Sequence, residues 1–324
     1  ANTFLASYSS AGAYASVKQI GSTLSSVDLD VAANGDIYLG AGCSGTPDMN
    51  PDAGVNTIST GAGSHVAFAR YTPSLAYVWA FGVTTPIGGY RPKVGSGPSL
   101  DFYCSGAFAG TADFDPGPAT NNLTSYYSNM VSFFCKYGAT SGSYQWAKSL
   151  SPWERDTTDN QGYDTAGDIT LDSSENSYSI GIYRGRVDFD PGPLQSLGYC
   201  DHFAEAPFVI KHNAAGQFQW VLSWCPTVFG EYFVFSDVEL DMNGNILVAG
   251  YFHGTIDFDP GPGTSVLTTP GHDGFLLRLS PSGNFISVQH VMSGSALVLT
   301  MEIAANGDIF LGGRFHAASN FNPG

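Results

Sequence analysis

Basic residues are scarce in this chain. Lys and Arg together number 12 among 324 residues, Asp and Glu number 28, and the formal net charge is −16. Nucleic acids and anionic membrane surfaces are bound through clustered basic side chains, so both are disfavoured as partners. No apolar run approaches the roughly 18 residues of a membrane span, so we expect no membrane insertion. Cations, neutral glycans and proteins remain as partners.

Cysteines are also few, and none has the CxxC or Cys/His spacing that is typical of zinc. Cys43, Cys104 and Cys135 fall inside strand-like segments, where we interpret them as small buried hydrophobes. Cys200 and Cys225 flank one predicted hairpin and are a candidate disulfide. Charged residues make up only 12% of the chain and Gly numbers 40. This composition favours many short strands and turns in an extracellular or cell-surface protein.

Helical periodicity is absent, and a repeat takes its place. The sequence DFDPGP occurs at Asp113–Pro118, Asp188–Pro193 and Asp257–Pro262, and degenerate copies begin at Asp48 and Asn320. Successive copies are 63 to 75 residues apart. In most repeats an Asn-Gly type of turn precedes an alternating strand, as in DMNGNILVAGYF from Asp241, which is a strong hairpin signal. A second hairpin follows each acidic motif.

Each repeat therefore offers four strands, and five such repeats predict an all-β fold, a five-bladed β-propeller of four-stranded blades. The first strand-like segment matches the third strand of a repeat, and the last matches the second strand. We therefore expect one blade to be closed by both termini; an open array cut from a longer chain is the alternative. The expected blades within a single domain of residues 1–324 are residues 27–82, 97–150, 165–224, 236–291, and 297–324 with 1–21.

The repeat unit, with its DFDPG motif and its Gly-Asn-Ile-Tyr-like strand, resembles bacterial extracellular β-propeller repeats of the SBBP type, and the strand order within a blade is similar to that of NHL repeats. The resemblance covers essentially the whole chain. It implies a propeller fold in a secreted or surface protein, and it implies no shared set of catalytic residues. The second repeat lacks the Asn-Gly turn, and the first has lost the DFDPG spelling.

The alternating strand directions predict that the long connections of all blades emerge on one face. Variable loops on a rigid scaffold are common binding sites. Exposed aromatic and polar side chains on these loops suit sugars or protein partners; anchoring of the loops against the blades is the structural alternative. The candidate ligand-binding residues are Tyr90, Arg91, Trp153, Arg155, Tyr163, Phe229 and Tyr232.

Three interpretations are open for the aspartates of the acidic motif. They can accept backbone N–H groups of the Pro-Gly turn, or pair with the basic residues Arg70, Lys136, Lys211 and Arg278 of the third strands. They can also bind Ca²⁺ together with carbonyl and water oxygens. The candidate metal ligands are Asp113, Asp115, Asp188, Asp190, Asp257 and Asp259.

The GxSxG and HExxH motifs and a Gly-rich phosphate loop followed by a helix are absent. We expect a non-enzymatic binding, adhesion or structural scaffold module at a cell surface, with a protein or glycan partner or a larger surface assembly, and with Ca²⁺ as the one candidate cofactor. The alternative is a carbohydrate-active enzyme, a glycosidase or lyase, that uses two carboxylates of the third and fourth blades. Its candidates are Glu154, Asp156, Asp159, Asp164, Glu205 and Glu231.

Overall fold

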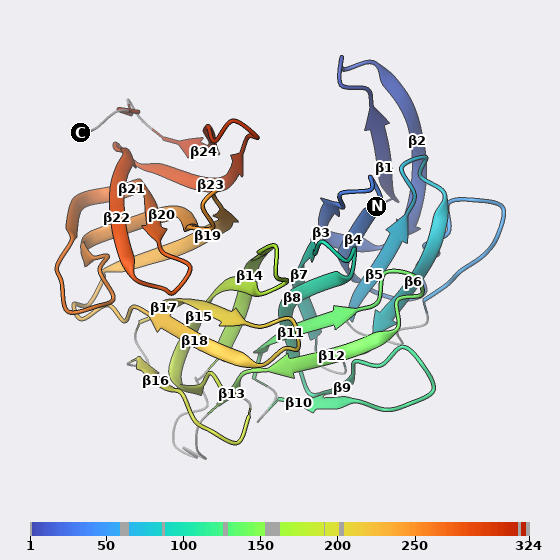
Figure 1. The fold of residues 1–324 in the computed structure, drawn as a ribbon, viewed down its shortest axis with the longest axis horizontal. Coiled ribbons are helices and arrows are strands. Elements are labelled where there is room, and N and C mark those ends of the chain that lie inside the picture. The colour runs from blue at the N-terminus through green and yellow to red at the C-terminus, as the bar shows by residue number, and fades with distance from the viewer. Residues whose placement is uncertain are drawn as a thin grey trace. The chain divides into compact units, whose positions relative to one another are not determined.

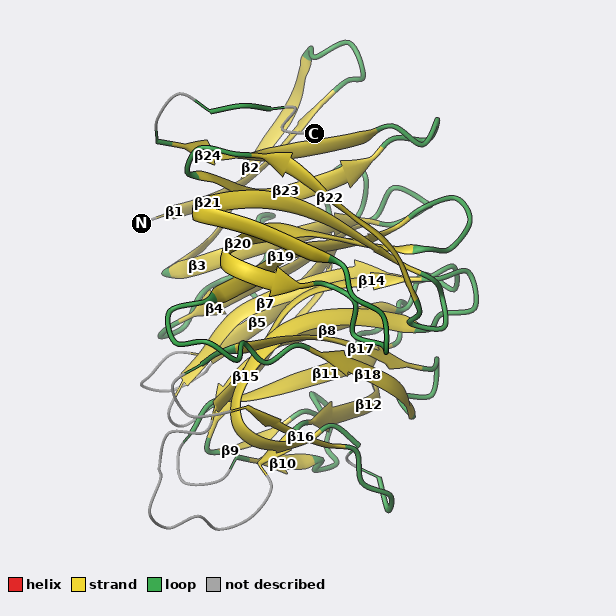
Figure 2. Ribbon diagram, turned by 90° about the vertical axis from the view of Figure 1, so that its left-hand side faces the viewer, coloured by secondary structure: helices red, strands yellow, loops and turns green. Residues whose placement is uncertain are grey.

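The computed structural model describes residues 2–321 except 59–64, 86–87, 126–128, 153–162, 191, 201–203 and 317–318. Within these residues all regular structure is β-strand and none is helix (Figure 2). No described helix could therefore cross a membrane. The all-β class expected from the sequence is confirmed. The chain divides into two compact units, residues 1–149 and 150–324.

The first unit contains two four-stranded antiparallel sheets (Figure 1). One sheet has the order β3-β4-β5-β6 and the other β12-β11-β8-β7. Two further pairs, β1 with β2 and β9 with β10, form small sheets of their own. The strands are β1 (Asn2–Tyr8), β2 (Tyr14–Ser22), β3 (Leu24–Val31), β4 (Ile37–Cys43), β5 (His65–Tyr71), β6 (Tyr77–Val83), β7 (Gly88–Ser96), β8 (Phe102–Ala109), β9 (Thr111–Asp113), β10 (Asn122–Thr124), β11 (Val131–Tyr137) and β12 (Tyr144–Ser149).

The second unit repeats this plan. Strands β14, β15, β17 and β18 pair in order, with β13 and β16 added along the extended end of β15; β19 to β22 form the next sheet, and β23 pairs with β24. The strands are β13 (Ser151–Pro152), β14 (Tyr163–Leu171), β15 (Ser177–Asp188), β16 (Leu197–Cys200), β17 (Ala206–His212), β18 (Phe218–Ser223), β19 (Tyr232–Leu240), β20 (Ile246–Asp257), β21 (Val266–Leu279), β22 (Phe285–Met292), β23 (Ala296–Ile303) and β24 (Ile309–Phe315).

Turn chemistry sets the first hairpin of several sheets. In the Asn-Gly turns, Gly35, Gly244 and Gly307 have φ of 84°, 75° and 87°. Glycine adopts this left-handed conformation without steric cost. The turn then reverses the chain tightly, as between Asp241 and Asn245, and starts the register of the sheet.

Four sheets thus match the four-stranded unit expected from the repeat. The fifth expected blade differs, because β1–β2 and β23–β24 are two separate two-stranded sheets among the described pairings. A closed ring is not identified in this pairing, so five-blade closure stays a prediction.

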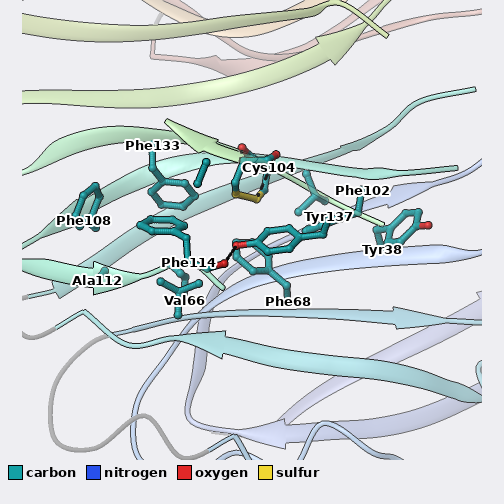
Figure 3. Packing of buried hydrophobic residues seen from close by; sticks show 14 of the residues in the cluster. Tyr38, Val66, Phe68, Phe102, Cys104, Phe108, Ala112, Phe114, Phe133 and Tyr137 are labelled. Atoms are coloured by element: carbon teal, nitrogen blue, oxygen red, sulfur yellow. Dashed lines mark hydrogen bonds between the residues drawn. A yellow bond between two sulfur atoms is a disulfide. The ribbon is translucent and has the colours of Figure 1, made fainter. Parts of the chain in front are cut away.

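Aromatic side chains fill the space between the two large sheets of the first unit (Figure 3). Phe102 packs against Phe68 and Tyr137, and Phe114 of the acidic motif packs against Phe133. The Tyr137 hydroxyl donates a hydrogen bond of 2.9 Å to the carbonyl of Phe114. The phenylalanine of the motif is therefore a core residue that fixes the connection after β8.

The cysteines correct one expectation. Cys104 and Cys135 are buried, but they lie opposite each other on β8 and β11 and form a disulfide, so they are not free thiols (Figure 3). Cys200 and Cys225 form a second disulfide, and Cys43 is a buried free thiol. Both disulfides lie within single units.

Candidate functional site

The acidic motif is built from hydrogen bonds between its aspartates and its own backbone. Asp113 Oδ1 accepts the N–H groups of Asp115 and Asn121 at 3.0 and 2.8 Å. Asp115 Oδ1 accepts the N–H of Gly117 at 2.7 Å. The same three bonds recur around Asp188 with Asp190 and around Asp257 with Asp259. This geometry is an Asx-type turn, and it gives the aspartates a structural role.

The proposed pairing of these aspartates with the basic residues of the third strands is wrong where partners are described. Arg70 pairs with Asp36, Lys136 with Asp101 at 3.2 Å, and Arg278 with Asp241 at 3.5 Å. These acidic partners lie in or beside the turns between the first two strands of each sheet. Lys211 donates to the carbonyl of Pro281 at 3.4 Å. The basic residues therefore bind at the end of the sheet opposite the acidic motifs.

Metal binding at the motif is not tested by this geometry. Among the described residues, no group of three or more His, Cys, Asp and Glu is arranged to hold a metal ion. The Oδ1 atom of each first aspartate already accepts two N–H groups, so a cation there would use the second carboxylate oxygen and carbonyls. Calcium at these six aspartates stays a prediction.

The candidate ligand-binding residues divide by what the structure describes. Trp153 and Arg155 lie outside the described residues, and for Tyr90 and Tyr163 only the backbone is described. Arg91 is exposed with φ of 48°, an unusual conformation for a residue with a side chain. Phe229 and Tyr232 are fully described; Phe229 lies in the connection between β18 and β19, and Tyr232 is the first residue of β19.

Phe229 is the most exposed large hydrophobic residue described, at 92%. The connection that carries it is tied down on both sides. Cys225 at its start is bonded to Cys200, and Glu231 at its end donates its N–H to the Val228 carbonyl and accepts the N–H of Thr255 at 3.1 Å. A large apolar side chain is thus held out in solvent by an anchored loop.

Tyr232 lies in a cluster of rings that the sequence did not reveal. Its ring stacks on His253 at a centroid distance of 5.7 Å, and its hydroxyl lies within hydrogen-bond distance of both imidazole nitrogens of His272. The ring centroids of His253 and His272 are 5.6 Å apart, and the ring of Tyr251 lies edge-on to that of His272. These residues come from β19, β20 and β21. We call Tyr232, Tyr251, His253 and His272 the His–Tyr cluster.

The carboxylates proposed for catalysis have structural partners where their side chains are described. Glu205 pairs with Arg184 at 3.2 Å, and Glu231 caps the backbone of Thr255. Glu154, Asp156 and Asp159 lie outside the described residues, and of Asp164 only the backbone is described. Catalysis by these carboxylates stays a prediction.

A different acidic pair, missed in the sequence, lies on β19. Asp237 Oδ2 accepts the backbone N–H of Met301 at 2.9 Å and the Thr300 hydroxyl at 3.0 Å. Burial, with the nearby charges of Asp237 and Glu302, raises the pKa of Glu239 to about 7. A short Asp-Val-Glu run reads as an ordinary alternating strand, so only the packing of β19 against β23 reveals this pair.

Comparisons with known proteins add little. No family model and no curated protein matches the chain. One similar solved structure is described as an unknown function protein from Dyadobacter fermentans DSM 18053. It shares 10% identity at a TM-score of 0.46, over 95% of this chain and 77% of that chain.

Proposed function

We propose that the protein is a secreted or cell-surface β-propeller that binds a protein or glycan through its loop face, without catalysis. The observation that carries the binding proposal is Phe229, 92% exposed on an anchored loop. An exposed aromatic residue on an anchored loop requires little ordering of the backbone on binding, which favours affinity. Burying it against a partner would also remove a large apolar area from water.

Ring closure is the structural half of the proposal, with β23-β24-β1-β2 as a fifth blade. Its support is a contrast between equivalent positions. Phe4 and Tyr8 on β1 are 69% and 63% exposed, and Phe310 and Phe315 on β24 are 61% and 58% exposed. The equivalent positions in the four complete sheets are at most 3% exposed. They are Ala67, Phe133, Phe208 and Phe275 for Phe4; Tyr71, Tyr137, His212 and Leu279 for Tyr8; Tyr38, Tyr103, Tyr178 and Leu247 for Phe310; and Cys43, Phe108, Tyr183 and Phe252 for Phe315.

An edge strand with exposed aromatic residues is a strong aggregation hazard unless it is covered. In each complete sheet the second and third strands pair and bury these positions. Pairing β24 with β1 would do the same for both terminal strands, and the two ends would supply one another's missing strands.

The chain contains its own template for testing closure. Cys104 and Cys135 are direct partners on β8 and β11, and the equivalent positions in a fifth sheet are Leu311 and Ala6. We expect the double variant Ala6→Cys/Leu311→Cys to form an intramolecular disulfide under mild oxidation, detected as a two-hydrogen mass loss in a monomer. Ser7→Cys/Leu311→Cys, one residue out of register, is the control. A crosslink only between chains, or equal crosslinking of both variants, contradicts closure.

Binding is tested separately. Beads coated with the protein are tested for retention on bacterial cells, and a glycan array covers the sugar ligands. We expect Phe229→Ser to reduce retention at least tenfold, and Met242→Ser, an exposed apolar residue in the short turn between β19 and β20, to leave it unchanged. Equal retention of all three proteins would refute a role for the Phe229 loop.

Two features support an extracellular location. Both disulfides need an oxidising compartment to form and persist, and the low charge content of the chain suits a durable surface protein. A scaffold role in a larger surface assembly shares the same fold and the same exposed loop.

A further inference from the structure

The His–Tyr cluster lies in the fourth sheet, β19 to β22, and other residue types occupy the equivalent positions of the third sheet, which contains β14, β15, β17 and β18. Tyr232 pairs with His253 across β19 and β20, just as Tyr163 pairs with Arg184 across β14 and β15. His272 immediately precedes Asp273, the partner of Phe252, just as Glu205 precedes Ala206, the partner of Tyr183. Arg184 and Glu205 therefore correspond to His253 and His272.

The third sheet shows that these two positions are in contact, because Arg184 and Glu205 form an ion pair of 3.2 Å. The fourth sheet replaces these opposite charges with two imidazoles. Two protonated imidazoles in contact would repel each other, whereas two neutral imidazoles offer lone pairs. The substitution removes an ion pair and creates a pair of possible metal ligands.

A hydrogen bond orients His253 for that role. Its Nδ1 lies 2.8 Å from the carbonyl oxygen of Gly271. A carbonyl only accepts, so Nδ1 carries the proton and the lone pair of the neutral ring is on Nε2. Metal-binding histidines are commonly oriented by such a bond from the other ring nitrogen to a carbonyl.

The phenol oxygen of Tyr232, near both nitrogens of His272, is a third donor atom in the same cluster. Imidazole ligands suit Cu²⁺, Ni²⁺ and Zn²⁺ and do not suit the hard ions Ca²⁺ and Mg²⁺, and a tyrosine oxygen would join them by losing its proton to the metal. The net charge of −16 also favours a cation at the surface.

We propose that His253 and His272, with Tyr232, form a binding site for a divalent transition-metal ion of the Cu²⁺, Ni²⁺ and Zn²⁺ class. Two imidazoles leave coordination positions for water or for a group from a binding partner. The site is independent of the binding role of Phe229 and of ring closure.

The test is titration of the intact chain with Cu²⁺ and with Zn²⁺ at pH 7.5 by calorimetry, with visible absorption as a second readout for copper. We expect one equivalent to bind and the affinity to fall on acidification through the range where imidazole protonates. The matched variant is His253→Arg/His272→Glu, which installs the pair of the third sheet. It should fold normally and bind the metal at least tenfold more weakly.

His290→Gln and His316→Gln are controls for adventitious binding, since neither residue belongs to the cluster. They should bind the metal like the unaltered chain. Should the double variant fail to fold, His272→Phe keeps a ring in place and gives a second reading. Unchanged affinity in the folded variant, or equal losses in the two controls, overturns the proposal.

Discussion

Asp237 accepts the backbone N–H of Met301 at 2.9 Å and so joins β19 to β23. The same contact recurs at other junctions between sheets. Asp28 accepts the N–H of Val94 at 3.0 Å, and Asp168 that of Val238 at 3.2 Å. The aspartate always lies on the first strand of its sheet, and the donor lies on the first strand of the next. The repeat thus encodes the packing of neighbouring sheets as well as the strands of each sheet.

Removing this contact should be costly at Asp237. The side chain is buried and also accepts the Thr300 hydroxyl. Because Asp237→Ala leaves the N–H of Met301 without a partner, we expect the free energy of unfolding to fall by about 2–3 kcal/mol. Urea denaturation followed by tryptophan fluorescence measures this change. Asp308→Ala, in an exposed turn, should change it by less than about 0.5 kcal/mol. Similar losses in both variants would contradict the structural role of Asp237.

The raised pKa of Glu239 predicts that the free energy of unfolding depends on pH. Its pKa is raised to about 7 in the folded protein, mainly by burial, so the folded state binds a proton more tightly than the unfolded state. Stability contributed by that proton is present below the unfolded pKa, near 4.5, and is lost as the pH rises towards 7. We expect Glu239→Gln, which cannot ionise, to be neutral at pH 4.5 and stabilising at pH 8, by at most about 3 kcal/mol.

The measurement is the difference in unfolding free energy between this variant and the unaltered chain across pH 4.5–8. Glu302→Gln is the comparison, because Glu302 is exposed and contributes to the shift only through its charge. A difference that does not vary with pH would show that Glu239 titrates normally.

The disulfide between Cys104 and Cys135 should stabilise the first unit. It bridges β8 and β11 and closes a loop with a sequence separation of 31. A constraint of this length on the unfolded chain contributes about 3.7 kcal/mol in the chain-entropy model. We expect Cys104→Ala/Cys135→Ala to lower the unfolding free energy by about that amount, measured without reductant. Added reductant should then destabilise the unaltered chain and should affect the variant only through Cys200–Cys225. Equal stability of the two proteins would show that the bridge adds no constraint.

The sequence predicted the parts of the fold that depend on neighbouring residues. Asn-Gly turns and alternating strands are local patterns, so four complete sheets could be expected from them. The partners of Arg70 and Arg278 could not, because Asp36 and Asp241 meet them only through strand register and packing. His253 and His272 meet beside an irregularity in the pairing of β20 with β21, between Phe252 and Gly254, and no spacing rule reveals this contact. Pairing of Cys104 with Cys135 likewise needed the register of β8 and β11.

The acidic motif gives a prediction that separates its structural role from calcium binding. Asp113 Oδ1 accepts two N–H groups, and Asp115 Oδ1 accepts one in an exposed turn. We expect Asp113→Ala to lower the unfolding free energy by about 1–2 kcal/mol and Asp115→Ala to lower it by less. Asp113→Asn keeps an oxygen acceptor at the same place, so it should retain most of the stability.

Thermal unfolding of these variants with EDTA and with added Ca²⁺ completes the test. A turn held only by hydrogen bonds gives the same midpoint in both solutions, with the Asn variant close to the unaltered chain. Bound calcium requires the negative charge, so EDTA and Asp113→Asn would both be destabilising, and EDTA, which acts on all three motifs, would be at least as destabilising as the single variant. The order of the Ala and Asn variants therefore distinguishes an oxygen that accepts N–H groups from a carboxylate that neutralises a cation.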